Sequence, residues 1–202
     1  ANQACSGRAG KFFHHAEFFD VDGDGLHDLI TARAHVPLVP PTEPTAELLW
    51  YKNPGPRHWL LRWLYPRKRW RPHLMFEGPD VMFRLKDLDG DTIPEIIATE
   101  FWGERLTVHW LKEGGEFGGG PSQWEHRTVL DNLGPLVNLT FVDVDGDGKE
   151  ELIITNHVID AELAGVFAIE FPDDFKQGIF ITHRLANDFP TVDPLPGKAS
   201  PG

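Results

Sequence analysis

The stretch that decides the fold is Asp20-Val21-Asp22-Gly23-Asp24-Gly25-Leu26-His27-Asp28, because the same pattern occurs twice more in the chain. The other copies run from Asp87 to Glu95 and from Asp143 to Glu151. Each copy has a carboxylate at its first, third, fifth and ninth positions, and an aliphatic run follows the last of them. A motif that recurs at intervals of this length indicates a repeat protein, either a propeller or an array.

The alternating carboxylates predict three calcium-binding loops. Calcium accepts six to eight oxygen ligands in a flexible geometry, which a tight loop with an acid at every second position can supply. The glycine after the second acid lets the chain turn sharply where a Cβ would interfere. The predicted oxygen donors are Asp20, Asp22, Asp24, the carbonyl of Leu26 and Asp28; Asp87, Asp89, Asp91, the carbonyl of Ile93 and Glu95; and Asp143, Asp145, Asp147, the carbonyl of Lys149 and Glu151.

The EF-hand is the obvious alternative, and the sequence excludes it. An EF-hand needs a bidentate Glu at the twelfth loop position and a helix on each side. The twelfth positions here are Thr31, Ala98 and Ile154, none of which carries a carboxylate. The aliphatic runs that follow the loops are typical of buried strands.

Composition limits the possible partners and compartments. The 202 residues are 41% hydrophobic, enough for a real core, and the formal charge of −12 argues against a nucleic-acid-binding surface. No apolar run is long enough to span a bilayer. Calcium loops of this kind need the high free calcium found outside cells, so we expect a secreted protein. The single cysteine, Cys5, then suggests a partner beyond this chain.

Aligning the three loops predicts an all-β fold of about three four-stranded propeller blades. Turn residues separate four short strand-like runs in each unit, as in a propeller blade. The expected division is an N-terminal segment 1–10, a first blade 11–78 with insertions, a second blade 79–135, a third blade 136–193, and a tail 194–202 that could begin a further blade.

The loops and strands resemble the FG-GAP/VCBS repeat of calcium-binding β-propellers over nearly the whole chain. Such repeats form the heads of integrin α-subunits, certain fungal lectins, and propeller parts of sugar-acting enzymes. The stretch from Trp50 to Gly55 looks most like the last group, which includes polysaccharide lyases and the fungal aldos-2-ulose dehydratase. Closed propellers need at least four blades, so the resemblance implies that further blades or another chain complete a larger ring.

A second candidate site lies at the face opposite the calcium loops, where first strands begin and second strands end. The histidines expected there are His14, His15, His35 and His157. Converging imidazoles would suit Zn²⁺ or a similar ion, which could polarise a sugar carbonyl while a free histidine acts as base. The alternative is that they are hydrogen-bonded residues lining a wet channel. Glu100 and Trp102 occupy the corresponding region of the second unit and are the predicted ligand contacts.

These observations leave three functions open. The first is a secreted, calcium-stabilised propeller module that binds or acts on carbohydrate. The second is the propeller part of a metal-dependent sugar lyase or dehydratase that uses the four histidines. The third is an adhesion module like an integrin head. Whether the chain is an enzyme stays open, although no nucleophile elbow, P-loop or dinucleotide fingerprint is present.

Overall fold

The structure is a computed structural model that describes residues 10–36, 44–55 and 69–187. Cys5, the predicted tail 194–202 and most of the insertions expected in the first blade lie outside these residues. In the part of the chain that is described, the only helical element is the short 3₁₀ turn η2 (Pro121–Gln123). Within the same part, no helix is long and apolar enough to cross a membrane.

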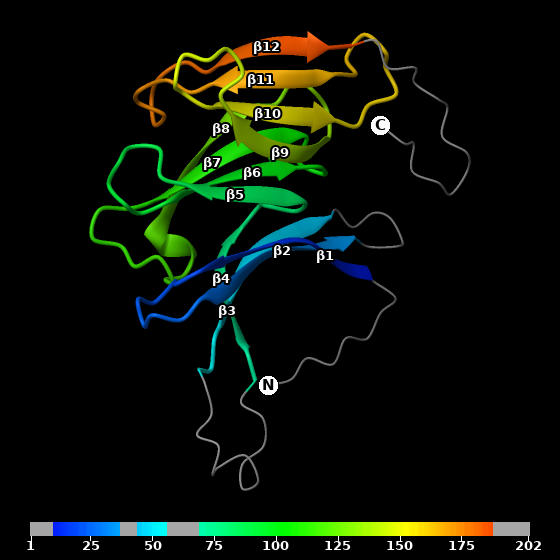
Figure 1. The fold of residues 1–202 in the computed structure, drawn as a ribbon. Helices are drawn as coiled ribbons and strands as arrows, with labels where there is room; N and C mark the ends of the chain where they lie inside the picture. Colours follow the sequence, from blue (N-terminus) through cyan, green and yellow to red (C-terminus); the bar gives the residue numbers. More distant parts are fainter. Residues whose placement is uncertain (1–9, 37–43, 56–68, 188–202) are drawn as a thin grey trace, which may run out of the picture.

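Three antiparallel four-stranded sheets make up the described part of the chain, so the predicted all-β fold with about three blade-like units is confirmed. Figure 1 shows the sheets following one another in chain order, from β1–β4 through β5–β8 to β9–β12. The strands are β1 (Gly10–Phe19), β2 (Asp28–Val36), β3 (Thr45–Lys52) and β4 (Arg71–Glu77); β5 (Met82–Lys86), β6 (Glu95–Glu100), β7 (Arg105–Leu111) and β8 (Trp124–Leu130); and β9 (Leu136–Val142), β10 (Glu151–Asn156), β11 (Val166–Glu170) and β12 (Ile181–Ala186).

Each acidic loop joins the first and second strands of its sheet, and all three loops lie along the left edge in Figure 1. The second strand of every sheet begins at the last carboxylate of its loop, namely Asp28, Glu95 or Glu151. This strand has a neighbour on both sides, and all six residues of β6 are buried. The aliphatic runs therefore form the inner strands because they are covered on both faces of the sheet.

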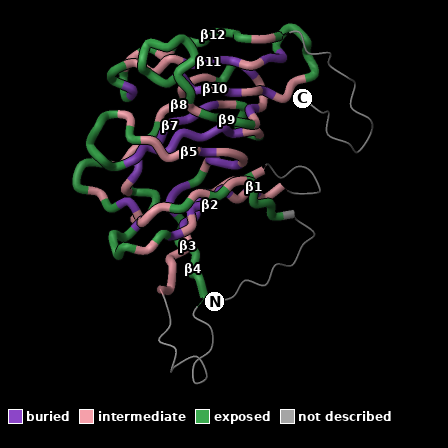
Figure 2. Tube along the Cα trace, viewed as in Figure 1, coloured by how far each residue is buried: buried purple, intermediate pink, exposed green. Residues whose placement is uncertain are grey.

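The hydrophobic core lies between consecutive sheets. One cluster joins Ile30, Leu48 and Trp50 of the first sheet to Phe83 and Ile96 of the second. A second cluster packs the other face of the second sheet against the third. It includes Ile97, Leu106, Val108, Leu139, Leu152, Ile154, Phe167 and Ile169. Each such side chain, when fully buried, stabilises the fold by about 1.5–3 kcal/mol. Figure 2 shows the buried residues along the strands and the exposed residues mainly along the connecting loops.

A β-bulge in β1 displaces two of the predicted site residues. Phe13 pairs with Arg33 and Ala16 pairs with Thr31, so His14 and His15 together oppose a single residue of β2. A bulge of this kind bends the strand and changes the direction in which its side chains project. The two histidines therefore leave the regular alternation in the middle of β1, and not at its start as the sequence predicts.

Candidate functional site

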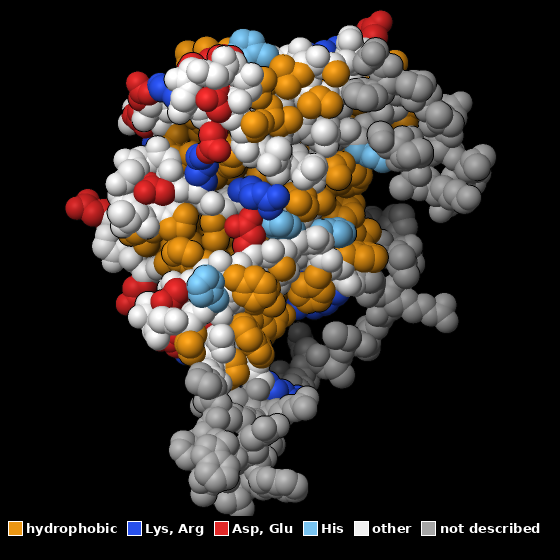
Figure 3. All heavy atoms as spheres, in the orientation of Figure 1, with side chains coloured by type: hydrophobic (Ala, Val, Ile, Leu, Met, Phe, Trp, Pro, Cys, Tyr) orange, Lys and Arg blue, Asp and Glu red, His pale blue; other side chains and the backbone are white. Residues whose placement is uncertain are grey.

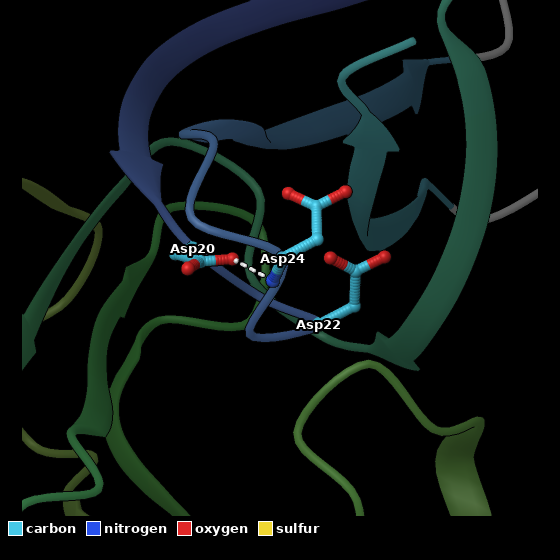
Figure 4. Close-up of side chains that lie close together, drawn as sticks. All are labelled: Asp20, Asp22 and Asp24. Carbon is cyan, nitrogen blue, oxygen red and sulfur yellow. Dashed lines mark hydrogen bonds between the residues drawn. The ribbon is translucent and has the colours of Figure 1, made fainter. Parts of the chain in front are cut away.

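The first acidic loop is organised by hydrogen bonds from its own backbone. Asp20 accepts hydrogen bonds from the N–H groups of Asp24 at 3.0 Å and Gly25 at 2.8 Å. Asp24 in turn accepts one from Leu26 at 3.0 Å. Figure 4 shows that the carboxylates of Asp22 and Asp24 lie side by side on one side of the loop, while Asp20 accepts a bond from the backbone of Asp24. The backbone of the loop thus orients the carboxylates of Asp20 and Asp24 locally.

The second and third loops repeat this arrangement and add a glutamate from the following strand. Asp87 accepts from Gly90 and Thr92, and Asp143 accepts from Gly146 and Gly148, all at 2.7–3.0 Å. The buried glutamates of the second and third loops accept from the backbone of the loop itself. These bonds are Leu88 N–H to Glu95 at 2.7 Å and Val144 N–H to Glu151 at 2.8 Å.

Each loop brings together three carboxylates whose oxygens lie within 4.8 Å of one another. The groups are Asp20, Asp22 and Asp24; Asp87, Asp89 and Glu95; and Asp143, Asp145 and Glu151. These nine residues are among the predicted donors. Of the remaining predicted donors, Asp91 and Asp147 accept hydrogen bonds from Ile93 and Lys149 inside their loops at 2.7 Å.

Asp28 stands apart from the first cluster but is completely buried. Its Oδ1 accepts a hydrogen bond from the Asn53 N–H at 2.5 Å, whereas its Oδ2 is buried with no hydrogen-bond partner in the described residues. An unpartnered buried carboxylate oxygen is costly unless a cation or donor compensates it. The donor set is entirely oxygen, so the loops fit a hard cation such as calcium.

The electrostatics of the second loop also favour a bound cation. The pKa of Glu95 is raised to about 7, first by burial and then by the nearby carboxylates of Asp89 and Asp91, against a hydrogen bond from the Leu88 N–H. Lysines already approach two of the loops: Lys52 contacts Asp22 and Asp24, and Lys176 lies 3.1 Å from Asp89. The loops therefore attract positive charge.

The predicted histidine site is more dispersed. His14 donates from Nδ1 to the Asp80 carbonyl at 2.8 Å, and His15 Nε2 lies 2.7 Å from Arg84. Among the described residues, the buried Nε2 of His35 has no hydrogen-bond partner. His157 donates its backbone N–H to the Pro135 carbonyl at 2.7 Å. No histidine belongs to a metal-sized group within the described ranges, so zinc at this face stays a prediction.

A pocket of about 300 Å³ opens at the same face, between the first and second sheets, and both predicted ligand residues line it. Glu100 is 3% exposed; its carboxylate accepts from Arg105 Nε at 2.7 Å and from the Thr107 hydroxyl at 3.0 Å. Trp102 keeps 37% of its surface exposed. A Cβ on Gly103 would stand 2.7 Å from the Glu100 carboxylate, so a larger residue here would have to displace that carboxylate.

Asp80 fixes the turn that lines this pocket, and it is not among the site residues that the sequence predicts. It is 2% exposed and accepts from the N–H groups of Phe101 at 2.7 Å and Trp102 at 2.9 Å. Burial raises its pKa to about 6, the two backbone hydrogen bonds lower it, and the neighbouring Glu100 raises it again. An aspartate just ahead of a strand carries no local signal that it caps a turn 21 residues away.

Comparison with known families resolves one part of this picture. Residues 87–154 match the FG-GAP-like repeat. The chain carries an FG-GAP-like repeat. No curated protein and no solved structure gave a match.

The FG-GAP-like match runs from the second acidic loop through the third and ends within β10. It therefore confirms the resemblance to FG-GAP/VCBS-type repeats that the acidic motif indicated. The particular resemblances to fungal lectins, aldos-2-ulose dehydratase and polysaccharide lyases are not confirmed by it. The match supports a β-propeller-type module and does not identify a ligand.

Proposed function

We propose that the chain is a calcium-stabilised β-propeller segment in which each acidic loop holds one Ca²⁺. The observation that carries this is the buried Oδ2 of Asp28 at the end of the first loop, which has no hydrogen-bond partner in the part of the chain that the structure describes. The second and third loops resemble each other: in each, a buried glutamate lies beside two exposed aspartates. Calcium would neutralise carboxylates that otherwise repel one another in a partly dehydrated site.

Calcium suits these loops better than the common alternatives. Magnesium demands a near-ideal octahedron and retains its waters, whereas these donors come from a flexible turn. Zinc and copper favour nitrogen or sulfur ligands, and the three clusters contain neither. In Figure 3 acidic side chains are frequent along the left edge, where the loops lie.

The proposed role of the ions is structural. Each loop ends directly on an inner strand, so a bound ion would fix the start of the most buried strand in its sheet. Affinities of extracellular calcium modules are about 10⁻⁴–10⁻³ M, which implies saturation outside cells and little binding inside them. A secreted location follows from this proposal.

Metal analysis combined with thermal unfolding tests the proposal. In equilibrium dialysis against free calcium well above these dissociation constants, the protein should bind about three Ca²⁺ per chain, one for each acidic cluster. Excess EGTA should lower the Tm, and adding calcium, but not an equal amount of magnesium, should restore it. A Tm that does not respond to EGTA or calcium, together with less than one bound ion, would overturn the proposal.

A second candidate function is carbohydrate binding at the pocket beside Trp102. An exposed indole face packs well against the C–H face of a sugar ring, and the Arg105 guanidinium, which uses only its Nε on Glu100, leaves N–H groups for hydroxyl oxygens. Asp80 and Glu100 make the frame rigid. Pockets with apolar walls and a few fixed polar groups are the usual form of small-molecule sites.

Glycan-array screening followed by titration tests this second function. Trp102→Ala should abolish binding, and Phe18→Ala, which removes an exposed aromatic ring that lines neither this pocket nor the cavity beside the first acidic loop, should leave it unchanged. Loss in both variants would contradict the proposed pocket. Turnover of the bound glycan would instead favour the lyase or dehydratase, and a protein ligand held through a divalent ion would favour adhesion.

A further inference from the structure

A second cavity, of about 520 Å³, lies beside the first acidic loop at the end of β3 and the start of β4. We call it the basic cavity, because Lys52, Arg69, Arg71 and His73 line it. Its only acidic lining residue is Asp24. A cationic cavity of this kind is unexpected in a chain with a formal charge of −12.

The strand pairing concentrates positive charge instead of dispersing it. Lys52 of β3 lies directly opposite Arg71 of β4, and Trp50 lies opposite His73. Like charges directly opposite in an antiparallel pair destabilise a sheet. Successive residues of a strand alternate in direction, so Arg71 and His73 share one face. An anion between these side chains would remove the repulsion.

Two arginines of the cavity, Arg69 and Arg71, have no polar partner among the described residues. Lys52 is engaged by Asp22 and Asp24, but within residues 10–36, 44–55 and 69–187 no ion pair or hydrogen bond engages the side chain of Arg69 or Arg71. Both are exposed. A guanidinium presents its donors as a planar fork that matches two oxygens of a carboxylate or sulfate.

An aromatic wall completes the cavity. The imidazole of His73 stacks on the Trp50 indole with ring centroids 4.6 Å apart and planes at 21°. The Trp50 N–H donates to the Gly118 carbonyl at 3.1 Å, which fixes the indole. Stacking on the fixed Trp50 indole therefore orients the His73 ring beside the arginines. The combination of free guanidinium groups with a flat ring surface suits an anionic group attached to a larger ring.

We propose that the basic cavity binds the oxyanion of an acidic saccharide, a carboxylate or a sulfate ester on a sugar ring. The two Arg69 and Arg71 guanidinium groups hold the oxyanion, and the ring lies toward His73. A cavity of this volume is in the range that small-molecule sites occupy. The site is distinct from the Trp102 pocket, which lies at the opposite edge of the sheets and is lined by other residues.

The first calcium loop is adjacent, because Asp24 and Leu26 line the basic cavity as well. A Ca²⁺ held by this loop adds positive charge beside the oxyanion, so the two should bind more tightly together. This coupling rests on the proposed calcium function; the anion site itself does not.

Three sugars that differ only at C6 test the site by isothermal titration: galacturonate, galactose 6-sulfate and galactose. We expect at least one of the two anionic sugars to bind at least tenfold more tightly than galactose, and the stronger one identifies the natural anion. The double variant Arg69→Gln/Arg71→Gln should weaken that binding at least tenfold. Lys11→Gln, which removes a positive charge at the far end of β1, should leave it unchanged.

Several outcomes would overturn the proposal. If galactose and both anionic sugars bind equally well, the anionic group plays no part in binding. If Lys11→Gln loses as much affinity as the double arginine variant, the effect is one of general charge. Inorganic sulfate that binds as tightly as galactose 6-sulfate would remove the saccharide from the proposal. Because Arg71→Gln relieves repulsion from Lys52, its Tm should be unchanged or higher by about 1–3 °C, so misfolding does not confuse the result.

Repeating the galactose 6-sulfate titration in excess EGTA separates this inference from the calcium proposal. A weaker but measurable affinity supports both the anion site and its coupling to the first loop. An unchanged affinity disproves the coupling and leaves the anion site supported. If calcium fails to bind at all while the arginine-dependent affinity persists, the calcium function fails alone.

Discussion

The Oδ2 of Asp80 accepts a hydrogen bond from the backbone N–H of Trp102 at 2.9 Å, and its Oδ1 accepts one from the preceding N–H at 2.7 Å. The residue that exposes an indole to solvent is thus oriented by a carboxylate that is itself buried. Nothing else in the turn replaces these two acceptors in the described residues. The conformation of the Trp102 pocket depends on a residue that no ligand needs to touch.

Replacing Asp80 with Ala should therefore disturb the pocket as well as the fold. The N–H groups of Phe101 and Trp102 would lose a charged acceptor, at a cost of about 1–3 kcal/mol in the free energy of unfolding. Urea unfolding measures that cost, and Trp fluorescence of the folded protein reports the released indole. Trp102→Ala serves as the comparison, since it should reduce glycan binding with a smaller loss of stability. An Asp80→Ala protein with unchanged stability and emission would contradict this role.

Thr92→Gly should stabilise the protein. Thr92 has a φ of +75°, a left-handed conformation that is strained for a β-branched residue, and the corresponding positions of the other loops are Gly25 and Gly148. Relief of this strain, less the entropy that glycine adds to the unfolded chain, should yield about 1 kcal/mol. Its N–H bond to Asp87 is kept. Thr140→Gly in the extended strand β9 is the control and should be destabilising; a destabilised Thr92→Gly would refute the argument.

His109 should make stability fall with decreasing pH. It is 3% exposed, and burial, followed by the charges of His126 and Arg105, lowers its pKa from 6.5 to about 3. In the folded protein it stays neutral, while in the unfolded chain it takes up a proton below pH 6.5. Its contribution is thus present above pH 6.5 and is lost as the pH falls toward 3.

From pH 7 to pH 5 this single group should lower the free energy of unfolding by about 2 kcal/mol. Urea unfolding across that range, compared between the parent and His109→Phe, isolates the effect because the ring stacked on Phe76 is retained. The variant should show a shallower dependence on pH by that amount. Identical slopes in the two proteins would mean that His109 does not titrate in this way.

Glu151→Gln should remove one calcium ion. Glu151 is buried and belongs to the third acidic cluster, so the neutral amide lowers the charge and loses a ligand oxygen at the end of the loop. We expect a stoichiometry of two Ca²⁺ instead of three and a smaller rise in Tm on adding calcium. Asp173→Asn removes an equal charge from a side chain that is 96% exposed and should change neither. Three ions retained in Glu151→Gln would place the ligands elsewhere.

Local pattern was enough for the acidic loops and the strands that follow them. The proposed ligand oxygens come from residues at most eight positions apart, and the hydrogen bonds within the loops span two to seven residues. The aliphatic runs after them could only be inner strands, since they have no polar face to present to water. These features are short-range, which is why reading along the chain recovers them.

The surroundings of the histidines, in contrast, depend on long-range contacts. The sequence predicts His14 and His15 at the start of the first strand, whereas they lie in the middle of β1. There the bulge and the contacts with Asp80 and Arg84 determine what each ring meets. Those partners lie 66 and 69 residues away. Whether side chains converge depends on the packing angle between neighbouring sheets, which no local periodicity encodes.

The sequence by itself determined the repeat, the acidic loops and the all-β character of the chain, because each depends on residue types at fixed short spacings. Only the tertiary structure decided that Asp80 organises the Trp102 turn and that Lys52 faces Arg71 across two strands to leave a cationic cavity. Both relationships join segments whose proximity results from sheet pairing and from burial of the faces between the sheets, and that packing is a property of the whole chain.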